Sequence, residues 1–115
     1  MGNPYIKEII ITTNNQPAFF KFKIIYRGSD YIGGEYIIYP IRYPGMNRYN
    51  STSHEAHLLT DENGNPYICW DSTIETFQDA NAIMFVWAKN YAKMYFGNTQ
   101  GRHRPTLPSG TFRNQ

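Results

Sequence analysis

Residues 19–27 read Phe-Phe-Lys-Phe-Lys-Ile-Ile-Tyr-Arg. Apolar side chains occupy every second position from Phe20 to Tyr26. The basic side chains of this stretch, Lys21, Lys23 and Arg27, fall on the other face. A period of two residues is typical of a strand with one face on a core and the other in water. This stretch therefore predicts a β-strand, with its aromatic face buried.

Two more strands are predicted on either side of this one. Residues 6–13 are rich in Ile and Thr, and the turn-forming run Asn-Asn-Gln-Pro at 14–17 ends them, which indicates a hairpin. Residues 28–30 and the glycine pair at 33–34 interrupt the chain, and a third strand follows at Glu35–Tyr39. Pro40 and Pro44 are expected to end that strand. The prediction is an antiparallel meander.

The rest of the chain predicts one loop, one helix and one tail. Residues 45–66 are polar and rich in turn formers, so we expect a long irregular connection with at most one short strand near His57–Thr60. An amphipathic helix is predicted over Thr76–Phe96, with Thr76 as its N-cap and Gly97 at its end. Its apolar stripe repeats at three and four residues: Ala80, Ile83, Met84, Trp87, Tyr91, Met94 and Tyr95.

Length and composition favour a single folded domain. The chain has 115 residues, of which 41% are hydrophobic and 17% aromatic, which is too apolar for intrinsic disorder. We expect one α+β domain over residues 1–97 and an irregular basic tail over 98–115. No apolar run approaches the roughly 20 residues of a membrane-spanning helix, and the first residues lack the apolar core of a secretory signal. The expectation is a cytoplasmic protein with no membrane partner.

Charge is unevenly distributed along the chain. All 9 acidic residues precede Ala80, and the C-terminal third is purely basic: Lys89, Lys93, Arg102, Arg104 and Arg113. Such a segment can contact nucleic acid or an acidic partner. With so few charges, nucleic-acid binding ranks last among the functions considered.

Cys69 is the only cysteine, so it can form neither an intrachain disulfide nor a cysteine-based zinc site. Cys69 is either an inert residue that only fills space in the structure or a reactive thiol. His54 and His57 lie three residues apart with Glu55 between them, but no third ligand accompanies them, so no metal is expected. The sequence also lacks the glycine and lysine spacing of a phosphate loop, and no cofactor is expected.

Several landmarks follow one another in a recognisable order. They are Tyr31-Ile32-Gly33-Gly34, then Pro40-Ile41-Arg42-Tyr43-Pro44, then His57, and finally Gly64-Asn65-Pro66-Tyr67-Ile68-Cys69-Trp70-Asp71. This order, over about residues 20–97, resembles the ubiquitin-conjugating enzyme (UBC-like) family. The nearest variant is its prokaryotic branch, found with cyclic-oligonucleotide-based anti-phage defence (CBASS) and with bacterial ubiquitin-like operons.

The resemblance implies a fold and an activity. The fold would be a UBC-like antiparallel β-meander of three to four strands packed against a C-terminal amphipathic helix, without the usual N-terminal helix. Cys69 would carry the C-terminus of a ubiquitin-like modifier or of a nucleotidyltransferase as a thioester. An activating enzyme would supply this acyl group, and an amine-bearing acceptor would receive it, in bacterial anti-phage defence.

Chemistry assigns candidate roles to the residues around Cys69. The nucleophile is the thiolate, which Arg102 or His103 of the tail would favour. Asn63 and Asn65 are candidate donors to the tetrahedral oxyanion, and Asp71 is a candidate for orienting the acceptor amine. The resemblance gives His57 a structural role, supporting the active-site loop.

One departure from the family pattern supports an alternative. Leu58 and Leu59 follow His57 in place of Pro-Asn, so the side-chain amide that stabilises the oxyanion is missing from its usual position. The alternative is a non-catalytic UBC-like protein-interaction module, in which Cys69 is packed and the sheet edge or the long loop binds a partner. Mutation of Cys69 distinguishes the two, because only the carrier requires the thiol.

Overall fold

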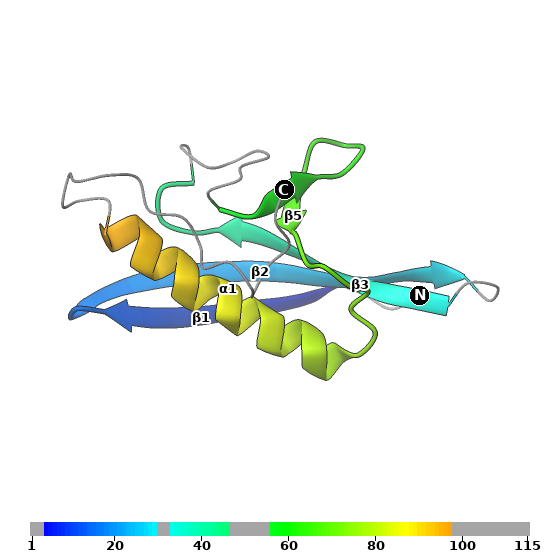
Figure 1. Cartoon of the computed structure of the whole chain (residues 1–115), viewed down its shortest axis with the longest axis horizontal. Helices are drawn as coiled ribbons and strands as arrows, with labels where there is room; N and C mark the ends of the chain where they lie inside the picture. The colour runs from blue at the N-terminus through cyan, green and yellow to red at the C-terminus, as the bar shows by residue number, and fades with distance from the viewer. Residues whose placement is uncertain (1–3, 30–32, 47–55, 98–115) are drawn as a thin grey trace.

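The computed structural model describes residues 4–29, 33–46 and 56–97 of the chain. Its elements are β1 (Tyr5–Thr13), β2 (Gln16–Ser29), β3 (Gly33–Arg42), β4 (Leu58–Thr60), β5 (Pro66–Ile68) and α1 (Phe77–Gly97). The predicted α+β class is confirmed, and so is the three-stranded antiparallel meander in the order β1-β2-β3. Figure 1 shows α1 lying across one face of this sheet.

A two-residue turn joins β1 to β2. Thr13 pairs with Gln16, and the residues between them, Asn14 and Asn15, have φ values of 51° and 64°. Positive φ at both central positions is the type I′ geometry that matches the right-handed twist of a hairpin, and Asn tolerates it better than most residues do. The turn therefore occupies only the first half of the predicted interruption.

The third strand is longer than predicted. Glu35–Tyr39 was the expected range, with Pro40 as the terminator, but β3 continues through Pro40 to Arg42. The pairing register shifts there: Phe22 pairs with Pro40 while Lys21 pairs with Arg42, which leaves Ile41 as an extra residue. Such a bulge interrupts the ladder and accommodates a residue that has no N–H to donate.

The core lies between the sheet and α1. The predicted buried face of β2 is confirmed for Phe20, Phe22 and Ile24, which are at most 2% exposed, whereas Tyr26 is 45% exposed. Trp87 and Tyr91 of the apolar stripe of α1 belong to the same core. Both are fully buried, so these aromatic residues are core residues as expected. The ring centroid of Trp87 lies 5.9 Å from that of Phe22 in an edge-to-face contact.

The predicted helix N-cap is also confirmed. The hydroxyl of Thr76 accepts a hydrogen bond from the backbone N–H of Asp79 at 3.0 Å. This bond satisfies one of the amides that the first turn of a helix leaves without a partner. The carboxylate of Asp79 lies in that same turn, where the helix dipole favours negative charge.

The connection after β3 contains a hairpin that the sequence did not predict in full. The short strand β4 agrees with the expectation near His57–Thr60, but β5 pairs with it and forms a second, two-stranded sheet. This hairpin lies beside β3 in Figure 1. Ile37 and Tyr39 of β3 are less than 9% exposed, although they lie on the face opposite α1. The predicted tail at 98–115 lies outside the described residues.

Candidate functional site

Cys69 lies directly after β5, between the hairpin and the loop that leads to α1. Its backbone N–H donates a hydrogen bond to the carbonyl of His57 at 2.9 Å, which extends the β4–β5 ladder by one residue. The residue is 1% exposed. An acyl donor must bring a carbonyl carbon into bonding distance of the sulfur, and the chain covering Cys69 prevents that approach in this conformation.

His57 supports the hairpin through its backbone. Its φ of 52° places it in the left-handed region, and the side chain is 6% exposed. Residues other than glycine rarely adopt this conformation, which directs the chain into β4. The structural role that the resemblance implies for His57 stays a prediction.

Asn63 and Asn65 lie in the turn between β4 and β5, around the carboxylate of Asp61. Both backbone N–H groups donate to Asp61 Oδ1 at 2.9 Å. The turn closes through the Asp61 N–H bond to the Asn65 carbonyl at 3.0 Å, and Gly64 takes a φ of 85° there. These residues are therefore arranged by the turn itself.

The hairpin separates the two asparagines from the thiol. Four residues of extended chain lead from Asn65 to Cys69, a span of about 13 Å at the usual rise of a strand. The structure does not bring these two amides together with Cys69. Asp71 is closer along the chain and is exposed to solvent. Arg102 and His103 lie outside the described residues, as do His54 and Glu55.

A groove of about 380 Å³ opens beside Cys69, between β3, the hairpin and the loop before α1. Ile68 and Trp70, the neighbours of Cys69, line it together with Asp71. Its far wall carries Glu35 and Arg27, whose side chains form an ion pair at 3.4 Å. The groove is thus open to solvent at its polar wall, while the cysteine behind it is not.

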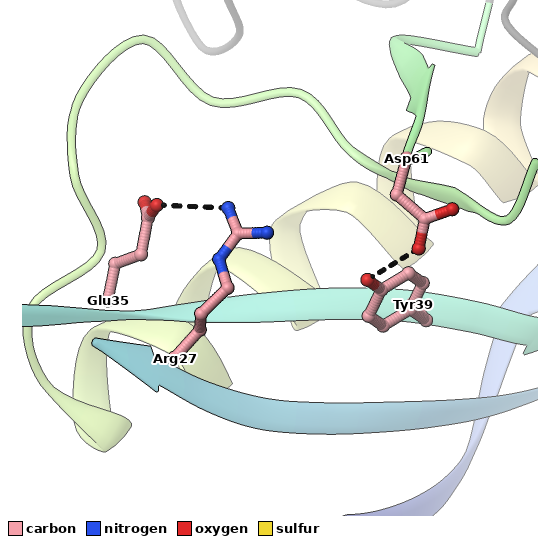
Figure 2. Close-up of polar contacts among 4 residues, drawn as sticks. All are labelled: Arg27, Glu35, Tyr39 and Asp61. Carbon is pink, nitrogen blue, oxygen red and sulfur yellow. Dashed lines mark hydrogen bonds and ion pairs between the residues drawn. The ribbon is translucent and has the colours of Figure 1, made fainter. Parts of the chain in front are cut away.

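A contact between Tyr39 and Asp61 links the β4–β5 hairpin to β3. The Tyr39 hydroxyl donates to Asp61 Oδ2 at 2.9 Å, and Figure 2 shows this contact together with the Arg27–Glu35 pair. Burial, followed by the bond to Asp61, raises the pKa of Tyr39 to about 12. The backbone N–H of Asn65 is the main cause that lowers the pKa of Asp61 below its ordinary value.

The structure also reveals an apolar surface that the sequence reasoning missed. Ile6, Ile10 and Phe19 are 47%, 59% and 60% exposed. Ile10 pairs with Phe19, and Ile6 lies four residues from Ile10 on the same strand, so all three side chains share the face opposite α1. We call this surface the open sheet face. Its signal in the sequence is Phe19, which lies out of phase with the buried aromatic residues of β2.

The described residues contain no group of three His, Cys, Asp or Glu side chains that could hold a metal ion. Within the same residues, no helix is long and apolar enough to cross a bilayer. Comparisons of the chain with protein-family models, with curated proteins and with solved structures found no match.

Proposed function

We propose that this chain is a UBC-like protein-interaction module, which binds a protein partner without forming a covalent bond to it. This proposal rests on the burial of Cys69. A cysteine that is 1% exposed packs in the interior, where an acyl donor has little access to its thiol. The positions of Asn63 and Asn65 support it as well, since their backbone bonds to Asp61 hold them in the turn.

The open sheet face is the binding surface in this proposal. Three large apolar side chains on one exposed face are a common feature of protein interfaces. An ion pair lies between them: Lys21 Nζ is 3.8 Å from Glu8 Oε2. Glu8 and Lys21 pair across β1 and β2, so one charged pair lies among the apolar side chains of this surface.

The test replaces Phe19 by a photo-crosslinking phenylalanine in the full chain and analyses crosslinked proteins from the native host. A module predicts one partner whose crosslink survives Cys69→Ala and is lost when Ile10→Glu is added. Ile41→Glu is the control, because Ile41 is also exposed but lies at the bulge of β3. Loss of the partner on Cys69→Ala alone would contradict the proposal.

A thioester carrier is the second candidate. The position of Cys69 favours it, since the only cysteine lies at the end of β5 with both neighbours on the groove. In this reaction the Cys69 thiolate attacks the thioester of the activating enzyme, whose own thiolate leaves. An amine of the acceptor then attacks the new thioester, forms an amide and releases the Cys69 thiolate. The resemblance relates this chemistry to bacterial anti-phage defence.

Intact mass decides between the two candidates. The full chain is incubated with ATP and the proteins encoded beside it, as wild type, Cys69→Ala and Cys69→Ser. The carrier predicts a reducible adduct on wild type, a stable ester on Cys69→Ser and no adduct on Cys69→Ala. The module predicts no adduct, together with a thiol that reacts with a thiol reagent only after denaturation.

A further inference from the structure

The two edges of the main sheet differ. On the β3 side, the backbone N–H of Tyr36 donates to the carbonyl of Ile74 at 2.8 Å, so the loop before α1 occupies part of that edge. On the other side, β1 pairs with β2 and with no further strand of the described chain. Figure 1 shows β1 along the margin of the sheet, next to α1. The edge of β1 thus presents backbone groups that a further strand can pair with.

The second half of β1 lacks the features that usually protect an edge. Residues 9–13 read Ile-Ile-Ile-Thr-Thr, with no charge and no proline. Their pairing with β2 runs without a register shift, so no bulge turns this edge away from a neighbour. Proteins commonly block edge strands by such devices, because an open edge accepts another chain.

A groove of about 460 Å³ follows this edge, between β1 and α1. Ile10–Thr13 line one side, and the helix contributes Val86, Lys89, Asn90 and Lys93. The two lysines lie one turn apart on the same face of α1. Neither forms an ion pair with any carboxylate in the described part of the chain, and the only acidic residue of α1 is Asp79 at its other end.

We propose that the β1 edge binds an extended acidic segment of a partner protein as an added strand. Backbone hydrogen bonds to residues 9–13 would hold the segment, and Lys89 and Lys93 would select acidic side chains on the helix side of it. This inference rests on the proposed role as a binding module, and it specifies the chemistry of the partner. The open sheet face, which shares Ile10, would continue the same interface.

Charge favours this occupant over a second copy of the chain. In an antiparallel pairing of two β1 strands about Ile9, Lys7 of one copy would lie opposite Ile11 of the other. It would thus approach the groove that Lys89 and Lys93 already make positive. A self-pairing edge would therefore bring like charges together, whereas an acidic strand neutralises them.

The test uses three fluorescein-labelled heptapeptides with the full-length chain. One alternates glutamate and valine, the second replaces glutamate by lysine, and the third is the glutamate peptide with alternate backbone amides methylated. Fluorescence anisotropy should show binding of the first peptide only, weakening as salt is added. Hydrogen exchange should show new protection at residues 9–13.

Two charge-reversal variants complete the test. Lys93→Glu should weaken binding of the acidic peptide by about two- to fivefold, a change typical of an exposed ion pair. Arg27→Glu, near the far end of β2, alters the net charge equally and should leave binding unchanged, because Arg27 pairs with Glu35 and lies away from residues 9–13. Equal binding of the acidic and basic peptides, binding of the methylated peptide, or protection elsewhere would overturn the proposal.

Two other outcomes separate this inference from the proposed function. A dimer in sedimentation equilibrium with residues 9–13 protected, and no peptide binding, would assign the edge to a second copy and overturn the inference alone. A Cys69 adduct in the mass experiment would overturn the proposed function, while the peptide measurements would still decide what the edge binds.

Discussion

The indole N–H of Trp87 donates a hydrogen bond to the backbone carbonyl of Ala56 across 2.7 Å, and both residues are completely buried. This bond joins the centre of α1 to the segment that turns into β4. It therefore ties the helix to the hairpin that carries Cys69. The indole is also in ring contact with Phe20, Phe22, Tyr43 and Tyr91.

Trp87→Phe should lower the free energy of unfolding by about 2–4 kcal/mol, because it removes a buried hydrogen bond and leaves a cavity. Urea denaturation followed by circular dichroism measures this loss. Trp70→Phe is the matched control, since Trp70 is the only other tryptophan and is partly exposed. A loss at Trp87 well below about 2 kcal/mol would contradict the stabilising role of the hydrogen bond to Ala56.

The β1–β2 turn predicts a stabilising substitution. Asn15 has a φ of 64°, which glycine adopts without steric cost, so Asn15→Gly should stabilise the chain by about 0.5 kcal/mol. Asn15→Ala should destabilise it by about 1 kcal/mol, the typical cost of a left-handed residue with a β-carbon. The midpoint of urea unfolding measures both, and a similar effect of the two substitutions would contradict the assigned turn.

Two glycines with positive φ form a matched pair. A β-carbon on Gly45 would lie 2.6 Å from a ring carbon of Tyr95, whereas one on Gly64 would have no neighbour within 4 Å. Gly64→Ala should therefore cost only the backbone strain, about 1 kcal/mol, and Gly45→Ala distinctly more. Thermal or urea unfolding of the two variants gives the comparison. Equal losses would mean that Tyr95 moves aside freely.

The Tyr39–Asp61 contact predicts a dependence of stability on high pH. The pKa of Tyr39 is raised to about 12 in the folded chain, above its ordinary value of 10.0. The folded state thus holds the proton more tightly, so this contribution is complete below pH 10 and is lost as the pH rises through 12. Tyr39→Phe removes the hydroxyl and should make unfolding less sensitive to pH between 10 and 12. Tyr43, whose pKa burial raises to about 12, retains part of the dependence.

Asp61 predicts the opposite dependence at low pH. Because the folded chain lowers its pKa below 3.8, its contribution is present above that value and is lost as acid protonates the folded carboxylate. Asp61→Asn should make the free energy of unfolding less dependent on pH in this acidic range. It should also speed hydrogen exchange at the amides of Asn63 and Asn65, which donate to Oδ1. Unchanged exchange at these two amides would contradict the role of the carboxylate.

Local pattern was sufficient to predict the meander and the helix. The alternation from Phe20 to Tyr26 marked the buried face of β2, and Thr76 with its apolar stripe marked α1, because each pattern repeats within one element. Pro40 misled the prediction, since a bulge lets β3 continue past a proline. β5 was missed because three residues are too few to show a period.

The candidate site depended on contacts that no local pattern contains. Cys69 was identified from its position in the chain, but its burial, with 1% of the residue exposed, is a property of the folded chain that no local sequence pattern displays. Asn63 and Asn65 were assigned by proximity along the chain to Cys69. The side chain of Asp61 instead organises the turn around itself, and the sequence did not indicate that Asn63 and Asn65 would be its donors.

The unequal edges of the sheet limit how large any assembly can become. Continuous growth by strand pairing requires two free edges on each molecule. One edge pairs with the previous molecule and the other pairs with the next. In the main sheet of the described chain, the loop residue Ile74 occupies part of the β3 edge through Tyr36, whereas the β1 edge pairs with no further strand. Pairing through β1 therefore ends after a single event, either with one acidic strand or with one other molecule. A strand sequence that would otherwise promote fibres is thereby restricted to a stoichiometric complex.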